Sequence, residues 1–246
     1  MRNILIISAL ILLLFNHRFL TAQEEKTTLY LIPGQGADST QFVNLKFDEQ
    51  FEVKNVKYFT PEKDWEMADF ARSLSAQIDT SKKYVIIGVS LGGMLATEMA
   101  DFMKPEKIII ISSAKHRKEL PGRYRFQNVI PFYKIFSARA IKRSAKYVQP
   151  IVEPDSKNDR EVFVKMLENK DPDFLKRTIK MIIAWKRKTY AKDIIHIHGD
   201  SDNTIPCRNV EYDYLIPDGS HMMVYTRAEE ISTILNKLLL QEVNLK

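Results

Sequence analysis

Residues 84–93 read Tyr-Val-Ile-Ile-Gly-Val-Ser-Leu-Gly-Gly and decide the fold of this chain. The first half of the stretch is apolar without polar alternation, which is typical of a strand buried on both faces of a parallel sheet. After the serine, Leu95 and Met99 recur at helical spacing. The stretch therefore predicts a strand, a sharp turn that carries Ser90, and a helix.

Gly88, Ser90 and Gly92 form a G-x-S-x-G pattern, which is called a nucleophile elbow when it joins a strand to a helix. The turn is strained, and the glycines let the strand and helix backbones approach closely. The serine hydroxyl then projects from the edge of the sheet. We interpret Ser90 as a catalytic nucleophile; the alternative is a glycine-rich structural turn whose serine has no chemical role.

Further short apolar runs alternate with helical patterns, which predicts an α/β fold with a mostly parallel sheet of about six strands flanked by helices. A helix is expected over residues 67–78 after a cap at Asp64, and the last helix is expected to begin with a capping box of Thr226 and Glu229. The expected strands are Thr27–Ile32, Glu52–Phe59, Tyr84–Val89, Lys107–Ser112, Ile194–His198 and Glu211–Ile216.

Residues 115–192 interrupt this alternation, because they contain no good strand candidate and several prolines. Asp171 and Pro172 have the residue types that cap and begin a helix. We expect a helical insertion between two strands, a lid, with helices at about 136–148, 159–168 and 173–187.

A serine nucleophile needs a base, and the base needs a carboxylate to orient it. His221 follows the last expected strand, and Asp200 and Asp202 follow the strand before it, so all three lie at the carboxyl edge of the sheet with Ser90. The chain order Ser, Asp, His is typical of this elbow. Asp202 is the preferred acid and Asp200 the reserve.

The oxyanion of an acyl-transfer intermediate needs two N–H donors. The N–H of Leu91, next to the serine, is one expected donor. The other is expected in the loop after the first strand, where Gly34 and Gly36 flank Gln35, and the N–H of Gln35 is the preferred donor. The alternative for this loop is phosphate binding, but Gly-x-Gly without a third glycine is weak evidence for a dinucleotide site.

These motifs together resemble the α/β-hydrolase family over nearly all of residues 27–240. The resemblance rests on Pro-Gly-Gln-Gly at 33–36, the elbow, His-Gly-Asp-Ser-Asp-Asn-Thr-Ile-Pro at 198–206 and Gly-Ser-His-Met-Met at 219–223. The family places its acid three residues after the loop glycine, which is Asp202 here, and its lid where this chain has its insertion. Two features depart from the family: Pro33 stands where many members have histidine, and the family's first two strands are expected to be absent.

The resemblance implies a serine hydrolase that cleaves a carboxylic ester of a small-molecule acyl substrate through an acyl-enzyme, without metal or cofactor. Thioesterase, amidase or another cofactor-free activity of the same fold is the first alternative. A metallohydrolase is another, since His196, His198, Asp200 and Asp202 alternate in sequence, although Ser201 stands where that metal motif has a histidine. A binding protein without activity is the third.

The N-terminus has the pattern of a signal peptide. Arg2 precedes an apolar run from Ile4 to Phe15, which is too short to span a bilayer. Cleavage after Ala22 would leave a hydrolase domain at 23–246 and export the protein to the periplasm or medium; the alternative is an uncleaved membrane anchor.

The chain has 246 residues, 45% of them hydrophobic, with 8 Gly and 10 Pro, which excludes collagen-like and disordered classes and fits one domain. Its net charge of +6 is unevenly distributed, because the insertion holds 21 Lys and Arg against 8 Asp and Glu. This basic lid predicts either an anionic substrate or membrane surface as partner, or simply a solvated face. Nothing in the sequence resembles a nucleic-acid recognition motif.

Overall fold

The computed structural model describes residues 26–127, 137–140, 142–143, 147 and 160–241. The expected signal peptide at 1–22 and its cleavage site lie outside these residues. Of the expected helix at 136–148, residues 138–140, 142–143 and 147 are helical, residue 137 is not, and the others lie outside the described residues. None of the described helices is long and apolar enough to cross a bilayer.

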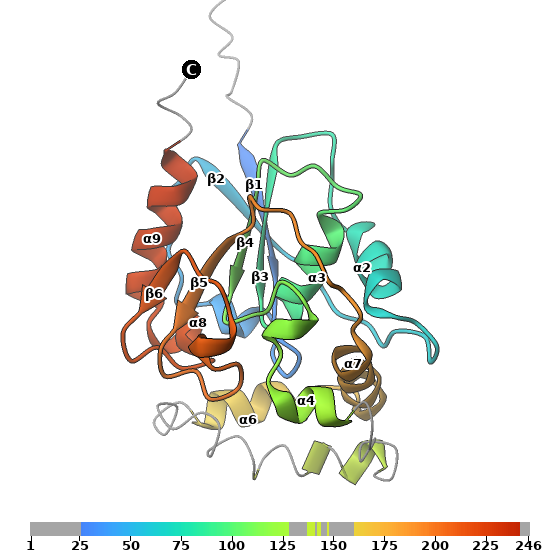
Figure 1. The fold of residues 1–246 in the computed structure, drawn as a ribbon. Helices are drawn as coiled ribbons and strands as arrows, with labels where there is room; N and C mark the ends of the chain where they lie inside the picture. Colours follow the sequence, from blue (N-terminus) through green and yellow to red (C-terminus); the bar gives the residue numbers. More distant parts are fainter. Residues whose placement is uncertain (1–25, 128–136, 141, 144–146, 148–159, 242–246) are drawn as a thin grey trace, which may run out of the picture.

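A six-stranded parallel sheet with the order β2-β1-β3-β4-β5-β6 forms the centre of the molecule (Figure 1). The predicted α/β class and parallel sheet are therefore confirmed. The strands are β1 (Thr27–Ile32), β2 (Phe51–Asn55), β3 (Tyr84–Val89), β4 (Lys107–Ile111), β5 (Ile195–Gly199) and β6 (Tyr214–Ile216).

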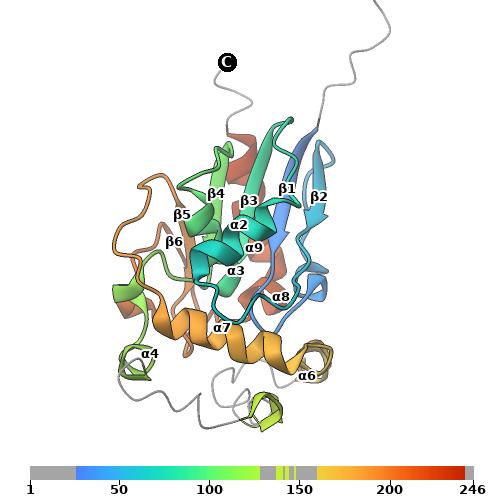
Figure 2. The same ribbon diagram turned by 90° about the vertical axis from the view of Figure 1, so that its right-hand side faces the viewer.

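Helices cover both faces of this sheet and its carboxyl edge. In Figure 2, α2 and α3 lie over one face and α9 lies behind the other, while α4, α6 and α7 lie across the edge where the strands end. The α-helices are α2 (Met67–Ser75), α3 (Leu91–Met99), α4 (Gly122–Gln127), α6 (Arg160–Glu168), α7 (Pro172–Ala184), α8 (Met223–Thr226) and α9 (Ala228–Leu240). Short 3-10 helices span Ser39–Phe42, Arg117–Glu119 and Cys207–Asn209.

Alternate residues of the central strands enter two separate cores, as the pleat of a strand requires. Tyr30 and Ile86 belong to the core under α2 and α3, whereas Leu31 and Ile87 belong to the core under α9. Because both faces of β3 are buried, its sequence is apolar at every position. This packing fixes the strand that leads into Ser90.

The outer strands are shorter than the sequence predicts. β2 ends at Asn55, because the backbone of Lys57 exchanges hydrogen bonds of 2.9 Å with the side chain of Gln77 and leaves the ladder. β6 begins only at Tyr214, because Glu211 N–H donates to the Glu119 carboxylate at 3.2 Å. The sheet therefore tapers at both edges.

Two predicted helix caps are wrong. α2 is capped at Glu66, whose N–H donates to Asp69 at 2.9 Å, and Asp64 lies before the helix. The expected capping box at Thr226 does not form, because Thr226 ends α8 and Arg227 precedes α9 without a side-chain cap. Thr226, which the sequence predicted as the cap of α9, therefore belongs to the separate short helix α8.

The described lid helices agree better with the sequence. Asp171 caps α7 by accepting from Asp173 N–H at 2.9 Å, and Pro172 is the first helical residue, as predicted. α7 ends at Ala184 rather than 187, because Trp185 adopts an extended ψ of 129° and donates to Glu98 at 2.7 Å. α4 has no counterpart among the helices expected from the sequence.

Candidate active site

Ser90 lies between β3 and α3 with φ 53° and ψ −116°, a strained backbone conformation for a residue with a side chain. The surrounding chain holds it there. Ser90 N–H donates to Ile111 O at 3.0 Å, and Ser90 O accepts from the N–H groups of Gly93 and Met94 at 3.0 and 3.1 Å. The elbow expected from the sequence is therefore present.

Both glycines of the motif are required by close backbone contacts. A Cβ atom on Gly88 would lie 2.4 Å from Gly92 O, and a Cβ on Gly92 would lie 2.2 Å from Ile32 O at the end of β1. Real Cβ contacts are essentially never under 3.0 Å. The glycines therefore allow β1, β3 and α3 to meet beneath Ser90.

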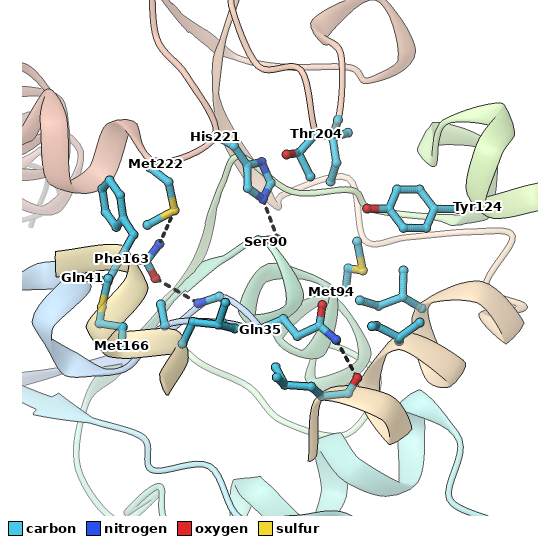
Figure 3. A pocket seen from close by; sticks show the side chains of 18 of the residues that line it. Gln35, Gln41, Ser90, Met94, Tyr124, Phe163, Met166, Thr204, His221 and Met222 are labelled. Carbon is cyan, nitrogen blue, oxygen red and sulfur yellow. Dashed lines mark hydrogen bonds between the residues drawn. The ribbon is translucent and has the colours of Figure 1, made fainter. Parts of the chain in front are cut away.

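His221 and Asp202 complete a hydrogen-bonded chain with Ser90. His221 Nε2 lies 2.8 Å from Ser90 Oγ, and His221 Nδ1 lies 2.8 Å from Asp202 Oδ2 (Figure 3 shows the first of these contacts). The second oxygen of Asp202 accepts from the N–H groups of Thr204 and Ile205 at 2.8 and 2.7 Å. The Asp202 side chain is fully buried, so its negative charge is stabilised by these donors.

The reserve acid is not part of this chain. Asp200 is exposed, and its carboxylate accepts from the neighbouring Ser201 hydroxyl at 3.0 Å. The acid and histidine loops meet at their backbones instead, because a Cβ on Gly199 would lie 2.0 Å from Gly219 O. This contact, with Ser201 N–H donating to Gly219 O at 3.1 Å, sets the distance between the loops that carry Asp202 and His221.

The loop after β1 approaches Ser90 as expected. Leu91 is the first residue of α3, so its N–H has no acceptor in a preceding helical turn. In the part of the chain that the structure describes, Gln35 N–H makes no hydrogen bond, while Gly34 N–H donates to Gln41 Oε1 at 2.9 Å. The two donors chosen from the sequence, Leu91 and Gln35, therefore remain available.

The Gln35 side chain ties this loop to the lid. Its Nε2 donates to Thr178 Oγ1 at 2.7 Å and to Leu175 O at 3.1 Å, both on α7 (Figure 3 shows the second of these bonds). Thr178 is fully buried and donates in turn to Phe174 O at 2.7 Å. The position of the loop is therefore set by a lid helix as well as by β1.

Two buried polar residues near the site were missed by the sequence analysis. Gln41 holds Gly34 N–H, and its own Nε2 lies 3.8 Å from the sulfur of Met222, next to His221. Ser113 donates to Ser90 O at 2.7 Å from behind the elbow. Neither belongs to a motif, and glutamine and serine are exposed in most proteins, so the sequence carried no signal for them.

His196 and His198 form a buried pair behind Asp202. His196 Nε2 lies 3.1 Å from His198 Nδ1. The other ring nitrogen of His196 lies 2.9 Å from Glu211 O, and that of His198 lies 2.8 Å from Ile205 O. Burial lowers the pKa of both imidazoles, well below the usual value for His196. All four ring nitrogens thus contact protein atoms. No group of metal-ligating side chains able to hold an ion is found among the described residues.

This pair predicts a loss of stability in acid. Both imidazoles have lower pKa values in the folded protein than in the unfolded chain, where the usual value is about 6.5. At a pH below about 6.5 the unfolded chain therefore binds protons that the folded protein does not. This contribution to stability is therefore present above about pH 6.5 and is lost as the pH falls below it. Thermal melts of the natural protein and of His198→Gln between pH 8 and 5 test this. The variant is expected to have a shallower dependence of Tm on pH, and equal slopes would contradict it.

A cavity of about 280 Å³ opens in front of Ser90 and His221, between the sheet edge and the lid helices. Its walls come mainly from α3, α4, α6 and α7 and from the loops after β1 and β5. It is the size of the smaller ligand-binding pockets of proteins. The serine hydroxyl thus faces a space that can hold a small molecule.

Comparison with known proteins places this geometry in a wider context. Residues 39–124, less than half of the chain, match the model of an uncharacterised protein family, UPF0227. No curated protein resembles the sequence closely enough to be identified as a relative.

Solved structures match much more of the chain. An enol-lactonase from Burkholderia xenovorans LB400 superimposes with a TM-score of 0.69 and 14% identity, over 89% of this chain and 93% of that one. A thermophilic esterase from Thermogutta terrifontis superimposes with a TM-score of 0.62 and 15% identity, over 87% of this chain and 90% of that one. A lipase-esterase related protein from Clostridium acetobutylicum superimposes with a TM-score of 0.61 and 15% identity, over 87% of this chain and 95% of that one. With the parallel sheet and the serine elbow, these similarities show that the chain has the α/β-hydrolase fold.

Proposed function

We propose that this chain is a serine hydrolase that cleaves carboxylic esters through an acyl-enzyme. Ser90 Oγ attacks the carbonyl carbon while His221 Nε2 takes its proton. Asp202 holds the imidazole in the required tautomer and stabilises its cation. His221 then gives the proton to the leaving alcohol, and a water that it deprotonates releases the acid.

The single observation that carries this proposal is the hydrogen-bonded chain from Ser90 through His221 to Asp202. Both contacts are 2.8 Å, within the reach that a nucleophile and its base require. The N–H groups of Leu91 and Gln35 are proposed to bind the oxyanion, since neither makes a hydrogen bond elsewhere in the described residues. The reaction uses only groups of this chain.

The names of the structural neighbours agree with this reaction class. A lactonase and an esterase both open the bond between an acyl carbon and an alkoxy oxygen. A shared fold alone does not carry function, so this agreement supports the proposal only by analogy.

Labelling with a fluorophosphonate probe tests the proposal. The probe phosphonylates an activated serine, and we expect about one label per chain, located at Ser90 by peptide mass spectrometry. The Ser90→Ala variant is expected to take up none, and EDTA is expected to leave labelling unchanged. Folded protein that takes up no label would overturn the proposal, and activity that EDTA abolishes would favour the metallohydrolase.

A further inference from the structure

The cavity in front of Ser90 has apolar walls on both sides of the hydroxyl. Figure 3 shows Phe163, Met166 and Met222 on one side of Ser90 and Met94 on the other, toward Tyr124. A substrate carbonyl placed at Ser90 therefore has an apolar wall on either side. Both the acyl part and the alcohol part of an ester would be enclosed by such walls.

The described part of the lining contains no Lys, Arg, Asp or Glu side chain. This is notable because the lid is strongly basic. On α7, Leu175, Ile179 and Ile182 line the cavity at helical spacing. Arg177 and Lys180 of the same helix donate instead to the carbonyls of residues 61 and 63, at 2.7 and 2.8 Å.

Two further cations, just after the end of α7, also have partners away from the cavity. Arg187 donates to Asp101 at 2.7 and 2.8 Å, and Lys186 pairs with Glu66 at 2.5 Å. These four basic side chains of the lid therefore contact groups outside the cavity. They do not line the cavity at Ser90.

Several polar atoms of the lining are already engaged. The side-chain oxygen of Gln41 accepts from Gly34 N–H, and the side-chain nitrogen of Gln35 donates to two oxygens on α7. Burial raises the pKa of the Tyr124 phenol, which keeps this hydroxyl neutral. A substrate carboxylate against the described part of this lining would lose its water without gaining a Lys or Arg partner there, which is strongly unfavourable.

We propose that the site takes an uncharged ester with apolar groups of medium length on the acyl side, and that it excludes acidic substrates. This inference rests on the proposed esterase function and names its substrate class. The cavity of about 280 Å³ lies at the small end of the range for ligand-binding pockets. We expect this space to enclose acyl chains of about four to eight carbons, and a chain of sixteen to extend beyond it.

The test compares p-nitrophenyl esters of straight-chain acids from two to sixteen carbons. Each methylene that enters the cavity is expected to raise kcat/KM about four-fold, up to about six to eight carbons, after which kcat/KM falls. A matched pair isolates the charge: the p-nitrophenyl monoester of adipic acid has the length of the hexanoate but ends in a carboxylate. We expect it to react at least about 100-fold more slowly. An adipate monoester that reacts as fast as the hexanoate, or a rate still rising at sixteen carbons, would overturn the inference.

A cavity variant provides a second measurement. Ile179→Phe adds volume to the wall formed by α7, and we expect it to lower the ratio of hexanoate to acetate kcat/KM about ten-fold. Val43→Phe is the matched control, because Val43 is 66% exposed and lies outside the lining. An unchanged ratio in Ile179→Phe would count against the inference.

Failure of this inference is distinguishable from failure of the proposed function. If the fluorophosphonate labels Ser90 but the charged ester is preferred, the chain is a serine hydrolase of another substrate class. If the protein takes up no label and hydrolyses none of the esters, the proposed function itself is wrong.

Discussion

Replacing Ser90 with alanine is expected to lower kcat for p-nitrophenyl hexanoate by about 10⁴- to 10⁶-fold. The variant has no oxygen 2.8 Å from His221 Nε2, so no acyl-enzyme forms. The proposed oxyanion donors remain in place, and a small residual rate above that of water is therefore expected. Alanine keeps the Cβ of serine, so the backbone strain of the turn is unchanged and the variant should fold.

Initial rates with each purified variant, alongside a far-UV circular dichroism spectrum, measure this effect. Ser81→Ala is a suitable control, because Ser81 is exposed and contacts Asp79 in a turn outside the candidate site. It should retain the activity of the natural protein. A Ser90→Ala protein with more than a tenth of that activity would exclude Ser90 as the nucleophile.

Asp202→Asn is expected to lower kcat by about 10⁴-fold. The asparagine oxygen can still accept from Thr204 and Ile205, so the loop is retained. Its amide nitrogen donates hydrogen bonds, however, and would face His221 Nδ1, which holds the imidazole in the wrong tautomer. His221 Nε2 would then carry a proton and could not accept the one from Ser90.

Asp200→Asn is the matched control, since it makes the same chemical change two residues away. Asp200 is exposed and its carboxylate accepts from Ser201, so we expect kcat within about two-fold of that of the natural protein, as for most surface substitutions. Steady-state rates of both variants at pH 8 decide between the two acids. A large loss in Asp200→Asn with normal activity in Asp202→Asn would reverse the assignment.

The sequence predicted the elements that depend on local pattern. β3 was predicted at its observed bounds, because a run buried on both faces has few alternatives. The turn at Ser90 followed from the glycines at 88 and 92, whose side-chain-free backbone the strand and helix contacts require. The positions of Asp202 and His221 followed from the rule that parallel strands end at one edge.

The remaining features depend on contacts between distant parts of the chain. Gln41 reaches Gly34 only because the turn of residues 34–37 places the two side by side. The direction of Arg177 and Lys180 away from the cavity depends on how α7 is rotated against the sheet edge. Net charge along the sequence carries no information about that rotation, so the basic lid alone suggested an anionic substrate.

The hydrogen bonds from Gln35 to α7 link a lid helix to the loop that carries a proposed oxyanion donor. Outward movement of α7 would break these bonds and release the loop that carries the Gln35 N–H. Apolar contacts that draw α7 toward the sheet would instead hold the loop beside Ser90. The binding energy of the substrate's hydrocarbon part is thereby coupled to the charge that develops on its carbonyl oxygen, so a longer apolar chain should increase kcat as well as lower KM.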